Sequence, residues 1–347
     1  MRAAIYKKFK SPIEIVQVPN PVPGPDDVII RVKATGICRS DWHGWQGHDS
    51  DIRLPHVPGH ELAGTVEIIG SNIKNWKKDD RVTVPFCGGC GYCTQCKKGQ
   101  EQICDHYFQP GFTGWGSFAE LVKIEYADHN LVRLPDSVSY TTAALLGCRF
   151  ITAWRGVISQ GRLVAQDWIA IHGCGGVGLS AIMIAAAHGA IVIAVDIDDA
   201  KLQFAKNTGA AYTLNARHIK NIPAAIKEIS KEGVSISVDA LGSWETCKNS
   251  VLSLRKQGRH IQLGLLSGSD ANPPIPMSDV IARELELIGS HGMQAHQYPA
   301  MMDMIVAGRL KPEKLLGKIV SLEEGVKEMM DMNSFKNTGI TIIAFND

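Results

Sequence analysis

The chain has 347 residues, enough for about two domains, and 45% of them are hydrophobic. Its 36 Lys and Arg residues against 35 Asp and Glu leave a formal charge of +1, which argues against disorder and against nucleic acid as the main partner. Its apolar runs are shorter than the roughly 18 residues needed to span a bilayer, and the N-terminal MRAAIYKKFK lacks the apolar core of a secretion signal. We therefore expect a cytoplasmic protein that is not bound to a membrane.

Short β-branched segments separated by Pro and Gly dominate the part of the chain before Tyr140 and predict a β-rich domain. Its clearest expected strands are Asp27–Ala34, Leu62–Ile69 and Arg81–Pro85. From about position 150 onward, strands alternate with helices, which predicts a parallel sheet covered on both faces. Its expected elements are strands Trp168–His172, Ile191–Asp196, Ser235–Leu241, Arg259–Gly264 and Leu285–Gly289, with helices Leu179–His188 and Ala200–Thr208. The closing segments are expected to be helices Pro299–Gly308 and Leu322–Met332 and strand Gly339–Phe345.

Nine cysteines, an odd number, make a disulfide framework a poor explanation and metal binding a better one. Four of them lie in one short segment as Cys90-x2-Cys93-x2-Cys96-x7-Cys104. Four thiolates satisfy tetrahedral Zn²⁺ and leave no open position, so this zinc would be structural. An iron–sulfur cluster uses similar spacing, and unligated cysteines in a surface loop are the remaining alternative.

A glycine motif predicts a dinucleotide-binding loop between an expected strand and an expected helix. It runs Gly173-Cys174-Gly175-Gly176-Val177-Gly178. The glycines allow a tight turn, close approach to a pyrophosphate and close packing of helix on strand. Asp196 ends the next strand, close to the position at which a carboxylate binds the ribose hydroxyls of NAD and repels the 2′-phosphate of NADP. The expected cofactor is therefore NAD(H).

Three further segments carry possible metal ligands, namely Cys38 in GICRSDWH, His60 in GHE and Cys148 in GCRFITA. Together with the four-cysteine lobe, they resemble the zinc-dependent alcohol dehydrogenases of the medium-chain dehydrogenase/reductase family, in the family's order and over essentially the whole chain. The resemblance implies an α/β fold with a GroES-like β-rich catalytic domain and a Rossmann domain with a doubly wound parallel sheet. The implied boundaries are 1–149 and 290–347 for the catalytic domain, about 87–105 for its zinc lobe, and 150–289 for the NAD-binding domain.

The resemblance implies a second, catalytic zinc, held by Cys38, His60 and Cys148 with one position left for water or substrate. Glu61 is then either an alternate zinc ligand or a charge that never reaches the metal. Asp41 matches the residue that hydrogen-bonds the ligating imidazole. With two zinc ions per chain, a zinc-bound alkoxide would pass its hydride to NAD.

Other positions match the family's proton relay and coenzyme contacts. Ser40 and His43 match the relay, with a turn serine and a plain surface histidine as the alternatives. The resemblance implies that Arg39 contacts the pyrophosphate of the coenzyme and that Lys201 lies near its adenosine ribose. The loops that would lie along the nicotinamide are Leu263, Gly264 and Leu265, and Gly289-Ser290. Lys201 is almost as well explained as a solvated helix residue.

One position departs from many relatives, which carry Arg where Ile340 follows Gly339. A lost charge-assisted hydrogen bond weakens binding by roughly 1.5–3 kcal/mol unless another cation compensates. We therefore predict a lower NAD affinity than in relatives that carry the Arg.

The sequence thus predicts reversible NAD-dependent oxidation of primary or secondary alcohols. A polyol or a cinnamyl-type aldehyde is the alternative substrate, and a non-catalytic nucleotide-binding protein is the alternative class. The candidates for an apolar pocket are Trp45, Phe86, Trp115 and Leu265, although a core or rim position explains each of them better. By family analogy the chain forms a homotetramer, with a dimer as the alternative, while Cys87, Cys174 and Cys247 have no assigned role.

Overall fold

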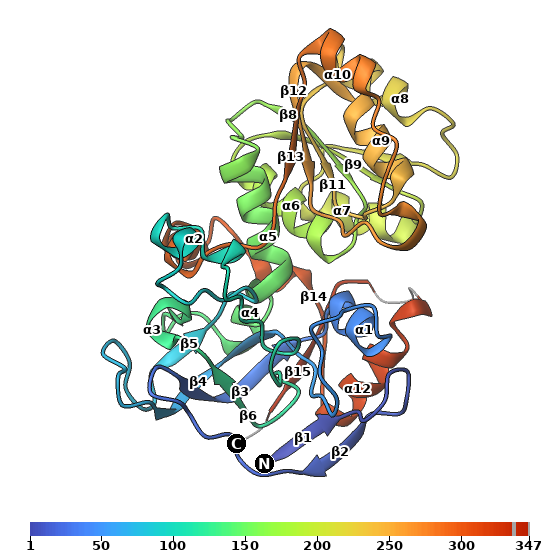
Figure 1. The fold of residues 1–347 in the computed structure, drawn as a ribbon. Helices are drawn as coiled ribbons and strands as arrows, with labels where there is room; N and C mark the ends of the chain where they lie inside the picture. The colour runs from blue at the N-terminus through green and yellow to red at the C-terminus, as the bar shows by residue number, and fades with distance from the viewer. Residues whose placement is uncertain (335–337, 346–347) are drawn as a thin grey trace. The chain divides into compact units, whose positions relative to one another are not determined.

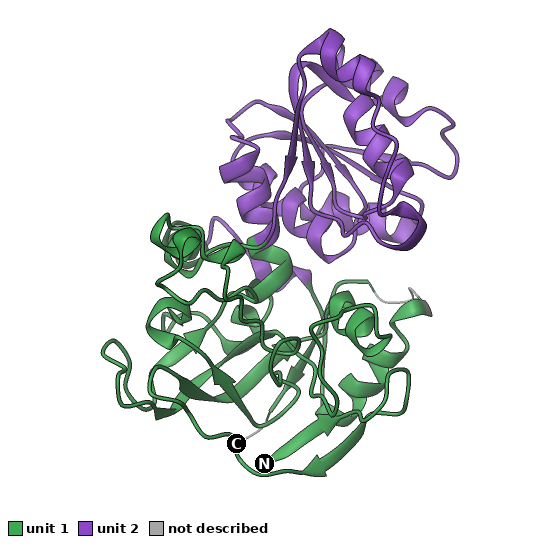
Figure 2. Ribbon diagram, in the orientation of Figure 1, with its two compact units in different colours: residues 1–151, 292–307, 316–347 green, residues 152–291, 308–315 purple. Residues whose placement is uncertain are grey.

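The computed structural model describes residues 1–334 and 338–345, and the chain folds into two units (Figure 2). Unit 1 contains Met1–Ile151, Gly292–Ala307 and Leu316–Asp347, and unit 2 contains Thr152–His291 and Gly308–Leu315. The predicted division assigns Gly308–Leu315 to the first domain. In the structure this segment belongs to unit 2, because its 3-10 turn η6 (Pro312–Leu315) contacts helix α6 (Gly176–Ala187).

Unit 1 is built on a seven-stranded sheet and a two-stranded hairpin (Figure 1). The sheet order is β14 (Leu316–Val320), β15 (Ile340–Ala344), β3 (Val28–Gly36), β4 (Glu61–Ile69), β5 (Arg81–Thr83) and β7 (Val132–Arg133), with β6 (Leu121–Ile124) on β3. The hairpin pairs β1 (Arg2–Ile5) with β2 (Glu14–Gln17). Alternating residues such as Val28, Ile30 and Val32 on β3 point into a buried apolar cluster with Leu62 and Val66 of β4. This alternation explains why these segments fold as strands.

Short helices connect the strands of unit 1. They are α1 (Arg39–Trp45), α2 (Thr94–Lys97), α3 (Ala127–Asn130), α4 (Tyr140–Ala143), α11 (Tyr298–Val306) and α12 (Leu322–Met330). A π-helical turn, η2 (Leu146–Phe150), follows α4 and leads into α5 (Ile151–Trp154). Inserted π turns of this kind often lie at functional sites. The 3-10 turns are η1 (Glu101–Ile103), η5 (Ala295–Gln297) and η7 (Met332–Ser334).

Unit 2 is an entirely parallel six-stranded sheet with helices on both sides (Figure 2). Its order is β10 (Tyr212–Asn215), β9 (Ile191–Asp196), β8 (Trp168–His172), β11 (Val234–Asp239), β12 (Leu254–Gln262) and β13 (Glu286–Gly289). The helices are α6, α7 (Asp199–Thr208), α8 (Ile222–Ser230), α9 (Trp244–Leu252) and α10 (Met277–Arg283), with π turn η3 (Arg155–Gln160) and 3-10 turn η4 (Gly268–Asp270). This is the doubly wound Rossmann arrangement, in which ligands bind at the carboxyl ends of the strands.

The predicted strands Trp168–His172 and Ile191–Asp196 match β8 and β9. The prediction for β12 was wrong at its start, because the strand begins at Leu254 rather than at Arg259. Its first half is mostly exposed and polar, and its register on β11 shifts after Leu254, so this part lacks an apolar signal. Among the described residues, no helix is both long and apolar enough to cross a membrane.

Candidate active site and metal centres

Two groups of clustered side chains stand out as possible metal sites among the described residues. The first is Cys90, Cys93, Cys96 and Cys104, and the second is Cys38, His60, Glu61 and Cys148. Within each group the potential ligand atoms all lie within 4.8 Å of one another. Both groups lie in unit 1, and all of the cysteines in them are free thiols.

The four-cysteine group has the dimensions of a single tetrahedral ion. The Sγ atoms of Cys90 and Cys96 are 3.9 Å apart and those of Cys93 and Cys104 are 3.7 Å apart. A tetrahedron with zinc–sulfur bonds of about 2.3 Å has edges of about 3.8 Å. Sulfur atoms this close enclose one ion and leave no room for a four-iron cluster.

The local backbone explains how this group forms. Backbone N–H groups of Cys93 and Cys96 donate to the sulfur atoms of Cys90 and Cys93, each at 3.4 Å. Gly91 adopts a positive φ of 80° at the tight turn, a conformation that favours glycine. Cys87 lies outside the group, and its thiol donates instead to the carbonyl of Met293 at 3.7 Å.

The second group is assembled from three separate segments of unit 1. Cys38 caps helix α1 just after β3, and His60 precedes β4. These two strands are antiparallel, with Gly36 paired to Glu61, so their ends bring Cys38 and His60 together. Cys148 comes from the π turn η2. Two sulfurs and one imidazole nitrogen form the ligand set of an open zinc site.

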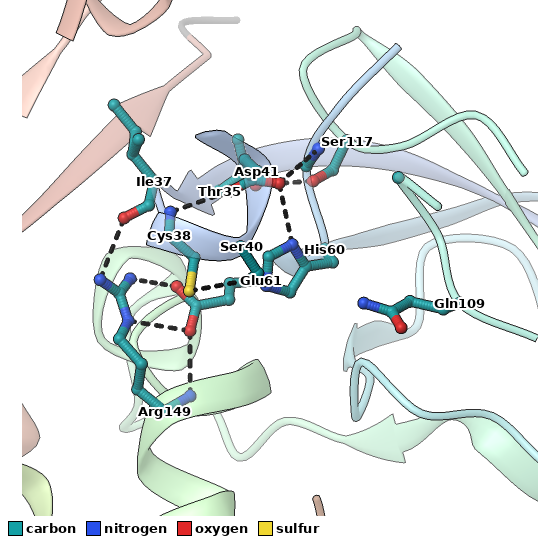
Figure 3. A network of polar contacts seen from close by, with 12 residues as sticks. Thr35, Ile37, Cys38, Ser40, Asp41, His60, Glu61, Gln109, Ser117 and Arg149 are labelled. Atoms are coloured by element: carbon teal, nitrogen blue, oxygen red, sulfur yellow. Dashed lines mark hydrogen bonds and ion pairs between the residues drawn. The ribbon is translucent and has the colours of Figure 1, made fainter. Parts of the chain in front are cut away.

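A buried carboxylate orients the imidazole of this group (Figure 3). Oδ1 of Asp41 accepts a hydrogen bond from Nδ1 of His60 at 2.9 Å, and Oδ2 accepts one from the backbone N–H of Cys38 at 2.9 Å. This bond to His60 is the contact that the resemblance implied for Asp41. It leaves Nε2 of His60 directed at the cysteines, which is how a ligating histidine is normally oriented.

Ser40 lies directly against the same ligand atoms. Its Oγ is 3.1 Å from Sγ of Cys38 and 3.1 Å from Nε2 of His60. A hydrogen bond from Cys148, together with the positive charge of Arg149, holds the pKa of the Cys38 thiol well below its usual range. A sulfur that ionises readily is the form that binds a metal.

His43 is half-buried on the same short helix as Ser40 and contacts a second histidine. Its Nδ1 is 3.0 Å from Nδ1 of His48, which is exposed. Burial, followed by the nearby charge of Arg39 and then His48, lowers the pKa of His43. Arg39 itself donates to the carbonyl of Met332 and stacks over the ring of Trp42 at 4.7 Å, all within unit 1.

The glycine loop in unit 2 has the shape that a pyrophosphate requires. Gly173 has a φ of 96°, and Gly175 caps helix α6 with open space at its Cα, so a phosphate can approach the backbone there. A Cβ on Gly178 would lie 1.8 Å from the carbonyl oxygen of Gly173, so only glycine fits. Gly176 and Val177 form the first turn of the helix, whose free N–H groups favour an anion.

Asp196 ends β9 beside this loop. Its Oδ2 accepts from the backbone N–H of Cys174 at 2.7 Å, and its Oδ1 accepts from that of Ile197 at 2.8 Å. Lys201 lies in the first turn of α7, whose cap Asp198 accepts its backbone N–H. The loop Leu263–Leu265 follows β12 in the same unit, and the N–H groups of Leu263 and Gly264 donate to the carbonyl of Asp239.

Two residues that lie against the second group, which contains Cys38, His60, Glu61 and Cys148, were not predicted from the sequence. Arg149 makes an ion pair with Glu61, and the ring of Phe112 lies 5.4 Å from that of His60. An arginine within the apolar run around Cys148 was the signal for the first. Of the expected pocket residues, Phe86 lies 6.2 Å from the His60 ring, whereas Trp115 instead lines an apolar hollow of about 250 Å³ with Met1 and Phe108.

Comparisons with known proteins agree with this geometry. Residues 24–136 match the alcohol dehydrogenase GroES-like domain, and residues 176–307 match the zinc-binding dehydrogenase domain. An alcohol dehydrogenase of Geobacillus stearothermophilus is 33% identical over 293 residues, which is 84% of each chain. The chain belongs to the zinc-dependent alcohol dehydrogenase family.

Other members of this family align over the whole length. The NAD-dependent alcohol dehydrogenase of Sulfurisphaera tokodaii is 30% identical over 352 residues, covering 99% of both chains. The solved structure of the alcohol dehydrogenase TADH from Thermus sp. ATN1 has a TM-score of 0.91 at 29% identity and covers 100% of both chains. The predicted fold class, a GroES-like domain with a Rossmann domain, is therefore confirmed.

Proposed function

We propose that this chain is an enzyme that reversibly oxidises primary or secondary alcohols to aldehydes or ketones with NAD. The observation that carries the proposal is the ligand set Cys38, His60 and Cys148, with the hydroxyl of Ser40 within 3.1 Å of two ligand atoms. Three protein ligands leave a position for substrate, and the adjacent hydroxyl is placed to take its proton. The family's members named above are alcohol dehydrogenases, and one of them is described as NAD-dependent.

The residues present fit two zinc ions per chain and one NAD. Cys38, His60 and Cys148 would hold the catalytic ion, and Cys90, Cys93, Cys96 and Cys104 the structural one. The loop Gly173–Gly178 with Asp196 would bind NAD, assisted by Arg39, Lys201 and the loop Leu263–Leu265. When bound, zinc supplies a Lewis acid that favours loss of the substrate proton, and NAD supplies the hydride acceptor.

The chain's own side chains move the proton. Ser40 Oγ would accept the proton from the substrate hydroxyl and release its own toward His43, which lies three residues further along the same helix. The lowered pKa of His43 keeps its imidazole neutral near pH 7, so it can accept that proton. Its exposed neighbour His48, with Nδ1 at 3.0 Å, lies toward solvent.

Further parts of the proposal concern domains, affinity and assembly. Unit 1 would carry the catalysis, with the zinc lobe at about 87–105, and unit 2 would bind NAD. The hydrocarbon side chain of Ile340 cannot supply a cation, so NAD affinity would be lower than in relatives with Arg there. The enzyme would act in the cytoplasm as a homotetramer, with a dimer as the alternative.

The decisive experiment combines metal analysis with NADH formation. The purified chain should hold two zinc ions and reduce NAD with at least one of ethanol, benzyl alcohol, a secondary alcohol, a 2,3-diol or a cinnamyl alcohol. Cys38→Ser should lose one zinc and nearly all of the activity. Cys247→Ser, which removes a buried cysteine outside both metal groups, is the matched control and should keep both. Full activity in Cys38→Ser would refute the proposed mechanism.

A further inference from the structure

An ion pair between Glu61 and Arg149 lies buried beside the proposed catalytic metal position (Figure 3). Oε1 of Glu61 accepts from the backbone N–H of Arg149 at 3.1 Å and from its Nε at 3.0 Å. Oε2 accepts from Nη2 of the same guanidinium. Both carboxylate oxygens are therefore engaged by one arginine, in the forked geometry that only arginine provides.

The same guanidinium also contacts the segment that carries Cys38. Nη1 of Arg149 donates to the carbonyl of Ile37 at 3.0 Å. Ile37 precedes Cys38, Glu61 follows His60, and Arg149 follows Cys148. The side chain of Arg149 thus bonds to the residues next to Cys38 and His60, and Arg149 itself follows Cys148.

The space around the ion pair leaves it little freedom. A Cβ on Gly36 would lie 2.4 Å from Oε2 of Glu61 and 3.1 Å from Nη2 of Arg149. The backbone of β3 therefore approaches the pair so closely that any side chain at position 36 would displace it. Glu61 itself has no exposed surface, and its carboxylate is paired with Arg149 while the ligand atoms of Cys38, His60 and Cys148 lie within 4.8 Å.

A carboxylate oxygen of Glu61 lies within 4.8 Å of each ligand atom, and carboxylates bind zinc well. Without Arg149, this carboxylate would be free to bind the metal as a fourth ligand and so to compete with substrate. We propose that Arg149 is a positioning residue that holds Glu61 off the metal and so keeps the fourth position open. This inference depends on the proposed metal site at Cys38, His60 and Cys148.

The inference is tested with cobalt in place of zinc, because the visible absorption of Co²⁺ reports its ligands. Arg149→Met should change the Co²⁺ spectrum, slow metal loss to dipicolinate at least threefold, and lower kcat at least tenfold. Arg149→Met/Glu61→Gln removes the competing carboxylate and should restore the wild-type spectrum and bring kcat to within threefold of Glu61→Gln alone. Arg133→Met, which removes an arginine paired with Asp80 in the same unit, is the matched control and should change neither.

Two results would overturn the inference. One is a Co²⁺ spectrum of Arg149→Met identical to that of the wild type. The other is a double variant that stays as impaired as Arg149→Met, because the arginine would then act through structure alone. Should Arg149→Met be insoluble, Arg149→Lys serves in its place, because lysine keeps the charge but cannot hold both carboxylate oxygens of Glu61. A Co²⁺ spectrum of Arg149→Lys identical to that of the wild type would also overturn the inference. Wild-type chain that binds Co²⁺ at the site but forms no NADH would refute the proposed function while leaving the spectral test intact.

Discussion

A chain of buried polar side chains in unit 2 should make this unit sensitive to acid. His172 of β8 and His260 of β12 are both buried, and Ser237 and Ser250 join them. Ser237 Oγ is 3.2 Å from Nε2 of His172, and Ser250 Oγ is 2.7 Å from Nδ1 of His260. Burial, with a smaller contribution from His260, lowers the pKa of His172 to about 3.

The sign and size of the effect follow from proton linkage. In the unfolded chain a histidine has a pKa of about 6.5, so between that value and about 3 the unfolded state binds a proton that folded His172 does not. The contribution of neutral His172 to the free energy of unfolding is at its maximum above about pH 6.5 and falls as the pH decreases. The loss approaches about 1.4 kcal/mol per pH unit and amounts to about 2 kcal/mol between pH 7 and pH 5.

The assay compares wild type with His172→Gln, which keeps a polar side chain but does not titrate. Urea-dependent hydrogen exchange of peptides from β8 and β11 measures unit 2, and comparing variants at equal pH cancels acid effects on the rest of the chain. The stability of wild type relative to His172→Gln should fall by about 2 kcal/mol from pH 7 to pH 5. His218→Gln, at an exposed histidine, should show no comparable change. A wild-type advantage that stays constant to within roughly 0.5 kcal/mol, the size of an ordinary experimental error, would refute the reasoning.

Four further substitutions test the proposed sites. Cys104→Ser should reduce bound zinc from two ions to one per chain, because three thiolates do not close the tetrahedron; metal analysis that still finds two would contradict this. Asp196→Ala should lower the preference for NAD over NADP at least tenfold, measured as the ratio of kcat/KM values, since the repelling carboxylate is lost. His43→Asn should lower kcat roughly 10²-fold near pH 7, and His48→Asn should move the acid limb of the kcat/KM profile to higher pH, because His48 helps to lower the pKa of His43. An unshifted profile would exclude His43 as the titrating group.

The sequence predicts best what is local in the chain. The four-cysteine lobe occupies one short segment, so spacing alone indicates a closed metal site, and the structure brings all four thiols together. The strands β8 and β9 are short, mostly apolar runs, and their bounds were predicted correctly. In each case a short window of residues contains the physical signal.

Long-range polar partners could not be predicted in this way. Arg149 and Glu61 are 88 residues apart, and nothing near either residue indicates the other. The exposed first half of β12 was missed because its residues 255–257 are polar and exposed and the register on β11 shifts there, so this part has no apolar alternation. The three proposed ligands of the open site were predicted through family resemblance, since Cys38, His60 and Cys148 have no informative spacing.

The ion pair with Arg149 bears on which of two roles Glu61 has beside the proposed metal site. From the sequence, a carboxylate beside His60 is equally consistent with a ligand and with a charge that never reaches the metal. A buried ion pair is rarely a net source of stability, because desolvation of both charges offsets their attraction. The forked pairing with Arg149 is therefore better explained by the geometry it imposes on three ligand-bearing segments than by stability. On this argument, replacing both charges by a neutral pair should cost little stability and leave kcat within threefold of that of Glu61→Gln alone, whereas removing Arg149 alone should lower both stability and kcat.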